Sequence, residues 1–308
     1  MKQSKKVVVL LSTYNGADYL KEQLDSLINQ SYKNIEIIVR DDGSKDGTPE
    51  ILREYENKNL IRVMYGENVG LNKSIFTLIK EAGEADYYSL AEQDDVWLPQ
   101  KLERAVEHLE KEDNDLIQIY TSGYDYYDSN MKFIGKGPRL AYPRSLVRTL
   151  VVTHIYLGFT MVLNATTKRF IDESKVVDMK LSCYHDYWLT LMGLSLGNIV
   201  YDSAVTTKYR RHESNISTFK TSFWAIQKDR FQKFIFGDEL KGYFTANHDF
   251  YELYKDKMSA KNRRYFELFD NRKYSIGKAI KKCFLRERYR DSWFDEIGLR
   301  LLFIFGKM

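Results

Sequence analysis

From Ser89 to Lys101 the chain reads Ser-Leu-Ala-Glu-Gln-Asp-Asp-Val-Trp-Leu-Pro-Gln-Lys. An apolar run that begins at Tyr87 predicts a buried strand, which runs into two adjacent carboxylates, Asp94 and Asp95. Open parallel sheets bind their ligands at the carboxyl ends of strands. Two carboxylates there repel each other unless a cation or hydrogen bonds hold them, and oxygen ligands suit Mg²⁺ or Mn²⁺ together with a substrate phosphate. The pair therefore indicates a divalent metal that carries a diphosphate; the alternative is a surface turn with an Asp as helix N-cap.

The chain around this stretch alternates short apolar runs with segments of helical periodicity. The expected strands are residues 7–11, 35–39, 61–65 and 87–91, and the expected helices are residues 17–29, 49–57, 71–82 and 100–111. This rhythm predicts an α/β fold with a doubly wound, mostly parallel sheet flanked by helices. Polar clusters follow three of the strands, at residues 12–15, 41–44 and 92–95. Because the carboxyl ends of parallel strands share one edge of a sheet, we expect these clusters to converge there.

The composition limits the class of protein. With 308 residues and 44% hydrophobic content, the chain can bury a full core. Its two cysteines, Cys183 and Cys283, lack metal-type spacing, which favours a reducing compartment without disulfides. The apolar run at residues 7–11 is too short for a signal peptide, and no run reaches the roughly 20 apolar residues that span a bilayer. We therefore expect a cytoplasmic protein.

Charge is distributed unevenly along the chain. Residues 219–308 hold 20 Lys and Arg against 12 Asp and Glu, whereas residues 1–218 are net acidic. We predict one domain over residues 1–218 and a helical, basic and aromatic C-terminal region over residues 219–308. Basic helices with aromatic faces bind anionic lipid surfaces, so this region is expected at the inner face of the cell membrane. A dimerisation element with solvated charges stays open as the alternative, and the acidic cleft upstream disfavours nucleic acid.

Several short motifs occur together in this chain. They are Ser12-Thr-Tyr-Asn15, Asp41-Asp-Gly-Ser44, Asp46-Gly-Thr48, Asn68-Val-Gly70, Gln93-Asp-Asp95, Trp97-Leu-Pro99, His185-Asp186 and Tyr209-Arg-Arg-His212. Each alone is a weak signal, since Asp-Gly-Ser is a common turn. In this order and spacing, over residues 7–217, they resemble the family 2 glycosyltransferases. The resemblance implies the GT-A fold for a catalytic domain over residues 1–218, and the sequence around residues 93–101 and Gly158 is most similar to the rhamnosyltransferase-type branch.

The resemblance assigns the donor nucleotide to residues of the three polar clusters. Ser12 and Tyr14 would cup the base, and a ring stacked on a nucleobase contributes about 1–3 kcal/mol. Asp42 would accept the N3–H of the base, Asp94 would contact the ribose, and Asp41 would stabilise the turn. From the residues alone, packing of Tyr14 against the following helix and an Asx turn at Asp42 remain open.

The resemblance assigns the metal to Asp95, with His212, and the catalytic base to Asp186. Gln93 stands where the family has a small residue or an Asp, so the completion of the metal shell stays open. A carboxylate at the start of a helix remains ionised because the helix dipole and free N–H groups favour its charge. Plain N-capping by Asp186 is the alternative.

Two arginines in the last motif, Arg210 and Arg211, are assigned to the donor diphosphate. Cationic donors are needed where a departing diphosphate develops charge. On an extended chain the two side chains point opposite ways, so we expect at most one of them to contact phosphate. A solvated basic turn is the alternative for either.

The predicted activity is an inverting glycosyl transfer that depends on Mg²⁺ or Mn²⁺. One base takes the proton of the acceptor hydroxyl while the nucleoside diphosphate leaves. The expected donor is dTDP-L-rhamnose, and the expected acceptor is a growing cell-surface polysaccharide or a lipid-linked glycan. The alternatives are another donor such as a UDP-sugar, a catalytically silent GT-A scaffold, and a nucleotidyltransferase, whose Gly-rich phosphate loop is missing after residues 7–11. A homodimer stays open.

Overall fold

The computed structural model describes residues 4–140, 144–151, 156–212, 239–272 and 274–306. The chain divides into two compact units. The first comprises Met1–Pro143, Tyr156–Leu181 and Gly197–Asn215, and the second comprises Arg144–Ile155, Ser182–Leu196 and Ile216–Met308. Two segments from the first 218 residues thus group with the C-terminal residues, and the division into domains at residue 218 stays a prediction.

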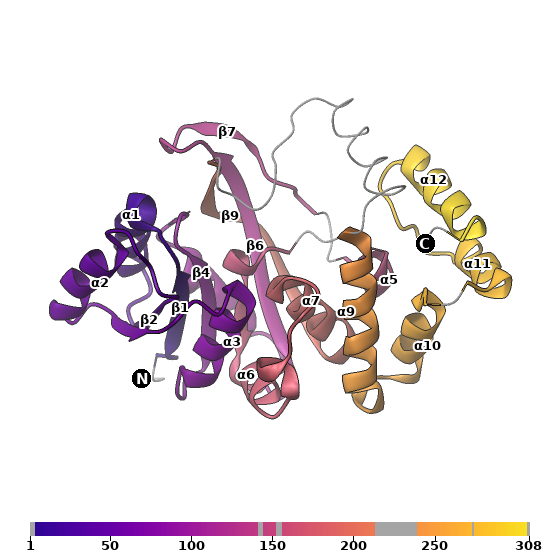
Figure 1. Cartoon of the computed structure of the whole chain (residues 1–308), viewed down its shortest axis with the longest axis horizontal. Coiled ribbons are helices and arrows are strands. Elements are labelled where there is room, and N and C mark those ends of the chain that lie inside the picture. Colours follow the sequence, from indigo (N-terminus) through magenta and orange to yellow (C-terminus); the bar gives the residue numbers. More distant parts are fainter. Residues whose placement is uncertain (1–3, 141–143, 152–155, 213–238, 273, 307–308) are drawn as a thin grey trace. The chain divides into compact units, whose positions relative to one another are not determined.

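The first unit is built on a single sheet, which contains nine strands among the described residues (Figure 1). They are β1 (Val7–Thr13), β2 (Ile35–Asp41), β3 (Arg62–Tyr65), β4 (Tyr87–Glu92), β5 (Val96–Trp97), β6 (Gln118–Tyr127), β7 (Phe133–Lys136), β8 (Val162–Asn164) and β9 (Asn198–Arg210). The order is β3-β2-β1-β4-β8-β6-β9-β5, with β7 paired to β6. Strands β3, β2, β1 and β4 are parallel, as predicted. Strand β8 is antiparallel to both β4 and β6, so the sheet changes direction at its middle.

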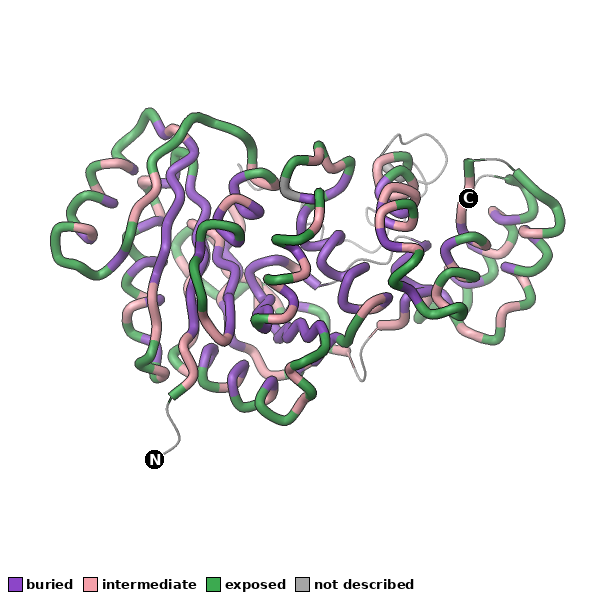
Figure 2. Tube along the Cα trace, turned by 90° about the horizontal axis from the view of Figure 1, so that it is seen from below, coloured by how far each residue is buried: buried purple, intermediate pink, exposed green. Residues whose placement is uncertain are grey.

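Helices of the first unit pack on this sheet. They are α1 (Ala17–Ile28), α2 (Thr48–Asn57), α3 (Leu71–Glu81), α4 (Lys101–Leu109), α6 (Ala165–Asp172) and the 3-10 helices η1 (Gly158–Thr160) and η2 (Lys175–Asp178). Every residue of β1 is buried, and Leu20, Leu24 and Leu27 of α1 belong to the same core cluster because they recur at helical spacing. Figure 2 accordingly shows buried strands and helices with one exposed face.

The strand register brings the three polar clusters to one level. Strand β1 pairs with β2 so that Thr13 lies opposite Asp41, and with β4 so that Ser12 lies opposite Glu92. All three strands are parallel and end within a residue or two of these pairs. The predicted convergence at the carboxyl edge of the sheet is therefore confirmed.

The regular elements of the second unit are all helices among its described residues. It contains α5 (Leu146–Leu150), α7 (His185–Leu196), α9 (Glu239–Tyr254), η3 (Lys255–Lys257), α10 (Ala260–Phe269), α11 (Ile276–Cys283) and α12 (Trp293–Ile304). Helix α7 is buried along most of its length, and Trp188 packs edge-on against Phe250, with ring centroids 5.0 Å apart. The Tyr187 hydroxyl lies 2.8 Å from Asn247 Oδ1. Among the described helices, none has both the length and the apolar character required to cross a bilayer.

Candidate functional site at the carboxyl edge of the sheet

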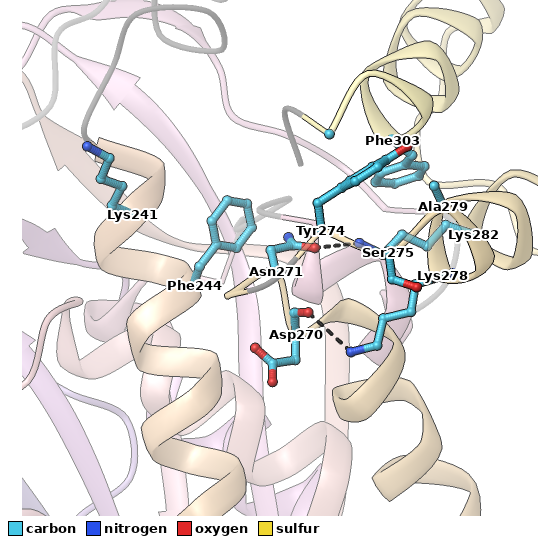
Figure 3. A pocket seen from close by; sticks show the side chains of 11 residues that line it. Lys241, Phe244, Asp270, Asn271, Tyr274, Ser275, Lys278, Ala279, Lys282 and Phe303 are labelled. Carbon is cyan, nitrogen blue, oxygen red and sulfur yellow. Dashed lines mark hydrogen bonds between the residues drawn. The ribbon is translucent and has the colours of Figure 1, made fainter.

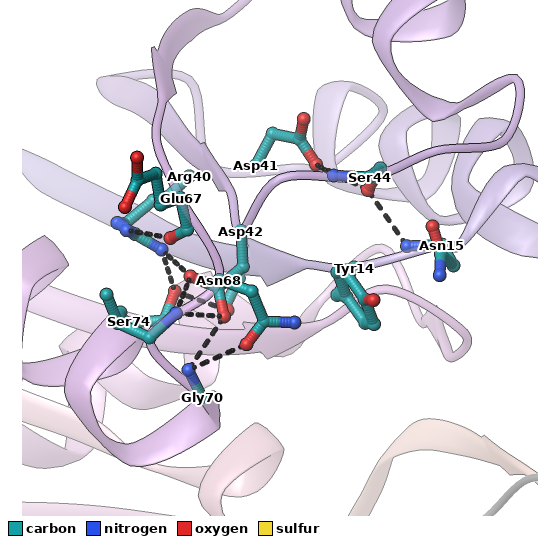
Figure 4. A network of polar contacts seen from close by, with 12 residues as sticks. Tyr14, Asn15, Arg40, Asp41, Asp42, Ser44, Glu67, Asn68, Gly70 and Ser74 are labelled. Carbon is teal, nitrogen blue, oxygen red and sulfur yellow. Dashed lines mark hydrogen bonds and ion pairs between the residues drawn. The ribbon is translucent and has the colours of Figure 1, made fainter.

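Asp42 connects the end of β2 to the loop before α3. Its carboxylate accepts hydrogen bonds from the Arg40 guanidinium and from the backbone N–H groups of Val69 (3.0 Å) and Gly70 (2.9 Å) (Figure 4). Gly70 has φ of 82°, a left-handed conformation that favours glycine. Arg40 also donates to Ser74 Oγ on α3. A buried ion pair thus fixes the loop that the sequence identifies as a motif.

Asp41 holds the turn after β2, as predicted. Its Oδ1 accepts hydrogen bonds from the backbone N–H and the hydroxyl of Ser44. The Ser44 hydroxyl in turn accepts from the backbone N–H of Asn15 at 2.8 Å, as Figure 4 shows. The turns after β1 and β2 are therefore joined through Ser44.

The turn after β1 carries the exposed ring of Tyr14. Gln93 Oε1 accepts hydrogen bonds from Thr13 Oγ1 (2.6 Å) and from the backbone N–H of Tyr14 (2.8 Å). A Cβ at Gly16 would lie 2.4 Å from that oxygen, so a larger residue there would displace the Gln93 amide. Tyr14 is 44% exposed and is not part of the core cluster that contains Leu20. Gln93 therefore braces the turn that presents this ring.

Ser12 lies beneath this turn, at the end of β1. It is buried, and its hydroxyl lies 2.7 Å from that of Ser74 on α3. Since Ser74 also accepts from Arg40, Ser12 and Asp42 belong to one connected polar network. The structure thus brings Ser12, Tyr14 and Asp42 to the same edge of the sheet.

An acidic cluster follows β4. Ligand oxygens of Glu92, Asp94 and Asp95 all lie within 4.8 Å of one another. Asp95 is fully buried; its Oδ1 accepts the backbone N–H of Arg210 at 3.1 Å, and its Oδ2 has no hydrogen-bond partner among the described residues. Burial, and then the charges of Asp94 and Glu92, raise the pKa of Asp95 well above its usual range. A divalent cation would relieve both the repulsion and the unpaired oxygen, so these residues fit one.

Arg210 holds the acidic segment from the side of β9. It is buried, and its guanidinium donates to the carbonyl oxygens of Asp94 and Ser129, both at 2.7 Å, and to the Glu22 carboxylate. It also lies 4.6 Å from the centroid of the Tyr19 ring. The Arg210 guanidinium is therefore surrounded by groups of the protein itself.

The two residues after Arg210 contact strand ends and the acidic cluster. Arg211 donates from its backbone N–H to the Tyr127 carbonyl and from its guanidinium to the Tyr209 hydroxyl at 2.9 Å. His212 Nε2 lies 2.8 Å from Asp94 Oδ2. The chain that continues from β9 thus brings His212 to the acidic cluster, and its role as a metal ligand stays a prediction.

Comparison with known proteins identifies the class of this site. The sequence profile described as glycosyl transferase family 2 matches residues 8–165. The chain belongs to glycosyl transferase family 2. The structure of TarS (residues 1–349) from Staphylococcus aureus in complex with UDP-GlcNAc aligns with a TM-score of 0.52 and 17% identity, over 90% of this chain and 80% of that one. This likeness shows the fold alone, and the predicted GT-A fold is confirmed.

Several relatives in sequence of this family 2 glycosyltransferase are bacterial proteins. An uncharacterized glycosyltransferase of Rickettsia typhi is 32% identical over 212 residues, which cover 68% of this chain and 64% of the relative. The dTDP-rhamnosyl transferase RfbG of Shigella flexneri is 27% identical over 232 residues, which cover 71% of this chain and 77% of the relative. The match thus spans less than two thirds of the Rickettsia protein.

Asp186, the expected base of this family 2 glycosyltransferase, lies in the second unit. It is the second residue of α7, and its Oδ1 accepts the backbone N–H of Tyr187 at 2.7 Å. This position at the helix start agrees with the sequence, and the catalytic role stays a prediction.

Lys101, at the first position of α4, lies near the acidic cluster but is not among the site residues predicted from the sequence. Its ammonium is fully buried, donates to Thr206 and Thr207 of β9, and lies 4.7 Å from the Trp97 ring centroid. Burial lowers its pKa to about 7, against the opposing attraction of Asp95. The signal was present, since Lys101 falls on the same helical face as the buried Ala105 and lies four residues before it.

Proposed function

We propose that this chain is an inverting glycosyltransferase that moves a sugar from a nucleoside diphosphate to an acceptor hydroxyl, with Mg²⁺ or Mn²⁺ at the acidic cluster. The observation that carries the proposal is the buried Asp95 oxygen without a partner among the described residues, beside Glu92 and Asp94 at the carboxyl edge of a GT-A sheet. A buried polar atom of this kind calls for a ligand.

The base of the donor nucleotide would lie against the Tyr14 ring. A carboxylate offers about four acceptor positions. In Asp42 the Arg40 guanidinium and two backbone N–H groups use three of them, which leaves one for the N3–H of the base. Ser12 would support this pocket from below through its contact with Ser74. The donor nucleotide would thus meet a rigid pocket, which limits the ordering cost of binding.

The diphosphate would lie over the acidic cluster. Asp95 would be the principal ligand of the ion, with Asp94 and His212 beside it. Bound there, the ion would neutralise charge on the leaving diphosphate. Since the contacts of Arg210 lie within the protein, we propose that it positions Asp94 and Asp95, and that Arg211 supplies the cation that faces phosphate.

Asp186 would take the proton of the acceptor hydroxyl. Inversion requires a base on the side of the sugar opposite the leaving group. The first-turn contact with the Tyr187 N–H favours the ionised form that a base needs.

For the donor sugar we propose L-rhamnose from dTDP-rhamnose. The support is the relative from Shigella flexneri, whose name gives this donor, together with the motif around residues 93–101. The acceptor would be a cell-surface polysaccharide or a lipid-linked glycan, and the protein would work at the inner face of the membrane. A UDP-sugar is the second candidate, because the solved S. aureus protein of the same fold holds UDP-GlcNAc.

A panel of nucleotide sugars with and without Mn²⁺ tests the proposal. The full chain should be stabilised against thermal unfolding by dTDP-rhamnose plus Mn²⁺ more than by either alone. Slow release of free sugar from the bound donor, of inverted anomeric configuration by NMR, should be lost in Asp186→Asn without loss of the thermal shift. If no nucleoside diphosphate shifts the unfolding temperature, the enzyme assignment is refuted; if a UDP-sugar alone does, only the donor is wrong.

A further inference from the structure

The outer faces of α11 and α12 expose many apolar side chains. Of the eighteen large apolar side chains that are exposed among the described residues, ten lie between residues 274 and 305. Phe294 is 90% exposed and Phe284 is 82% exposed. We call these ten side chains the hairpin surface. They are Tyr274, Ile276, Ile280 and Phe284 on or next to α11, and Trp293, Phe294, Ile297, Leu301, Ile304 and Phe305 on or next to α12. Apolar patches of this kind mark interaction sites, because proteins that remain in water rarely expose them.

These side chains are not used by the core of their own unit. Ile276, Ile280 and Phe284 recur every four residues and so form one stripe along α11. The opposite side of the helix packs inward, where Ala279 and Lys282 line a cavity of about 200 Å³ together with α9 and the last turn of α12 (Figure 3). Helix α11 thus packs against its own unit with one face, and its other face, which is apolar, is exposed.

The charges around the hairpin surface are cationic. Lys281, Arg286 and Arg288 are exposed, and the Arg288 guanidinium lies 4.4 Å from the centroid of the Trp293 ring. The one exposed acid between residues 274 and 306, Asp291, is paired with two arginines of the same unit. An apolar face with a basic rim is complementary to a surface that is apolar inside and anionic outside.

We propose that the hairpin surface binds an anionic lipid bilayer and lies in its interface. Helix α12 has 12 residues and is about 18 Å long, shorter than the roughly 30 Å hydrocarbon layer, so it would lie along the membrane plane. Exposed apolar side chains would enter the acyl boundary while the basic rim meets lipid phosphates. A second copy of the chain fits less well, because two basic rims would meet. The proposal does not rest on the sugar-transfer chemistry.

Vesicle sedimentation of the full chain tests it. Vesicles of phosphatidylcholine alone are compared with vesicles that contain phosphatidylglycerol in equal part. The double variant Phe284→Ser/Phe294→Ser should weaken binding to the anionic vesicles by about 30-fold or more, since each ring loses its burial in lipid. The matched control Phe133→Ser/Ile134→Ser removes two exposed apolar side chains of β7 and should bind as the parent does.

Several results distinguish the occupants of this face. Salt should weaken binding, and Arg286→Glu/Arg288→Glu should reduce it on anionic vesicles only. Because the substituted side chains are exposed, the variants should keep the parent unfolding temperature, which is checked by circular dichroism. The proposal is overturned if anionic vesicles do not bind the parent, or if Phe284→Ser/Phe294→Ser and Phe133→Ser/Ile134→Ser bind these vesicles equally. It is also overturned if light scattering shows a dimer that only the Phe284→Ser/Phe294→Ser change dissociates.

Discussion

Replacing Arg210 by Met separates a positioning role from direct contact with the diphosphate. The substitution removes two hydrogen bonds from a charged donor to carbonyl oxygens, the buried one of Asp94 and the partly buried one of Ser129. Bonds of this class contribute about 1.5–3 kcal/mol each. The pair with Glu22 adds little, because that carboxylate is half exposed. We therefore expect a loss of about 4 kcal/mol in the free energy of unfolding.

Thermal unfolding of the full chain measures this loss. For a unit of this size, 1 kcal/mol corresponds to roughly 2–4 °C, so Tm should fall by about 10 °C. Mn²⁺ affinity, measured by calorimetry at a temperature where the variant is folded, should fall as well, since the guanidinium fixes the Asp94 backbone. Arg211→Met is the matched control: its Tm should stay near the parent value while KM for the donor rises.

The opposite pattern would refute this reasoning. If Arg210→Met kept the parent Tm and Mn²⁺ affinity and only raised KM for the donor, Arg210 would act on the diphosphate itself. The contacts with Asp94, Ser129 and Glu22 would then contribute little to the fold.

Three further predictions concern buried charges. Asp95→Asn should raise Tm without metal, because it removes a buried carboxylate whose pKa is raised by burial and by Asp94, and it should abolish the rise in Tm that Mn²⁺ produces in the parent. Burial opposes ionisation of Asp202, but hydrogen bonds led by Arg104 outweigh it and lower its pKa, so its stabilisation is present above the unfolded pKa and is lost as pH falls through the folded value. Asp202→Asn should therefore cost about 2 kcal/mol in urea unfolding at neutral pH, with a smaller difference near pH ~3. Burial lowers the pKa of Lys101 to about 7 in the folded chain, whereas it is about 10 in the unfolded chain. Between these two pH values the unfolded chain binds one more proton than the folded chain, so the stability of the parent relative to Lys101→Met should rise with pH.

The parallel half of the sheet follows from local sequence. Residues 7–11 form a continuous apolar run, and residues 35–39 are apolar except for Glu36, a pattern typical of strands buried on both faces. Because helices separate such runs, their ends must meet at one edge, and the polar clusters could be placed there before the structure was known. The structure lengthens β1 and β2 by two residues each, into those clusters.

Strand β5, in the other half of the sheet, could not be predicted in this way. Strand β5 has two residues, Val96–Trp97, and lies inside a motif that reads as a turn. Its pairing with Lys208 and Thr207 of β9 joins residues more than 100 positions apart. Short strands held by such distant partners leave no periodic signal.

The site shows the same limit. The site residues could be predicted from the strand ends and from the family resemblance. The residues that hold them in place by hydrogen bonds could not. The partner of Arg210 on α1, Glu22, is 188 residues away, and Gln93 braces the Tyr14 turn from 79 residues away. Lys101 is the exception: its position four residues before Ala105, on the buried face of α4, could have predicted its burial.

The second unit takes its helices from three separate stretches of chain, and this has a practical consequence for anyone who wishes to study its parts. A fragment that stops at residue 218 would retain α5 and α7 but lose α9, which supplies Phe250 to Trp188 and Asn247 to Tyr187. The buried side of α7 would then face water, and such a fragment should aggregate when expressed. Isolation of the first unit therefore requires removal of the two internal segments that contain α5 and α7, with the gaps bridged, rather than a single stop codon.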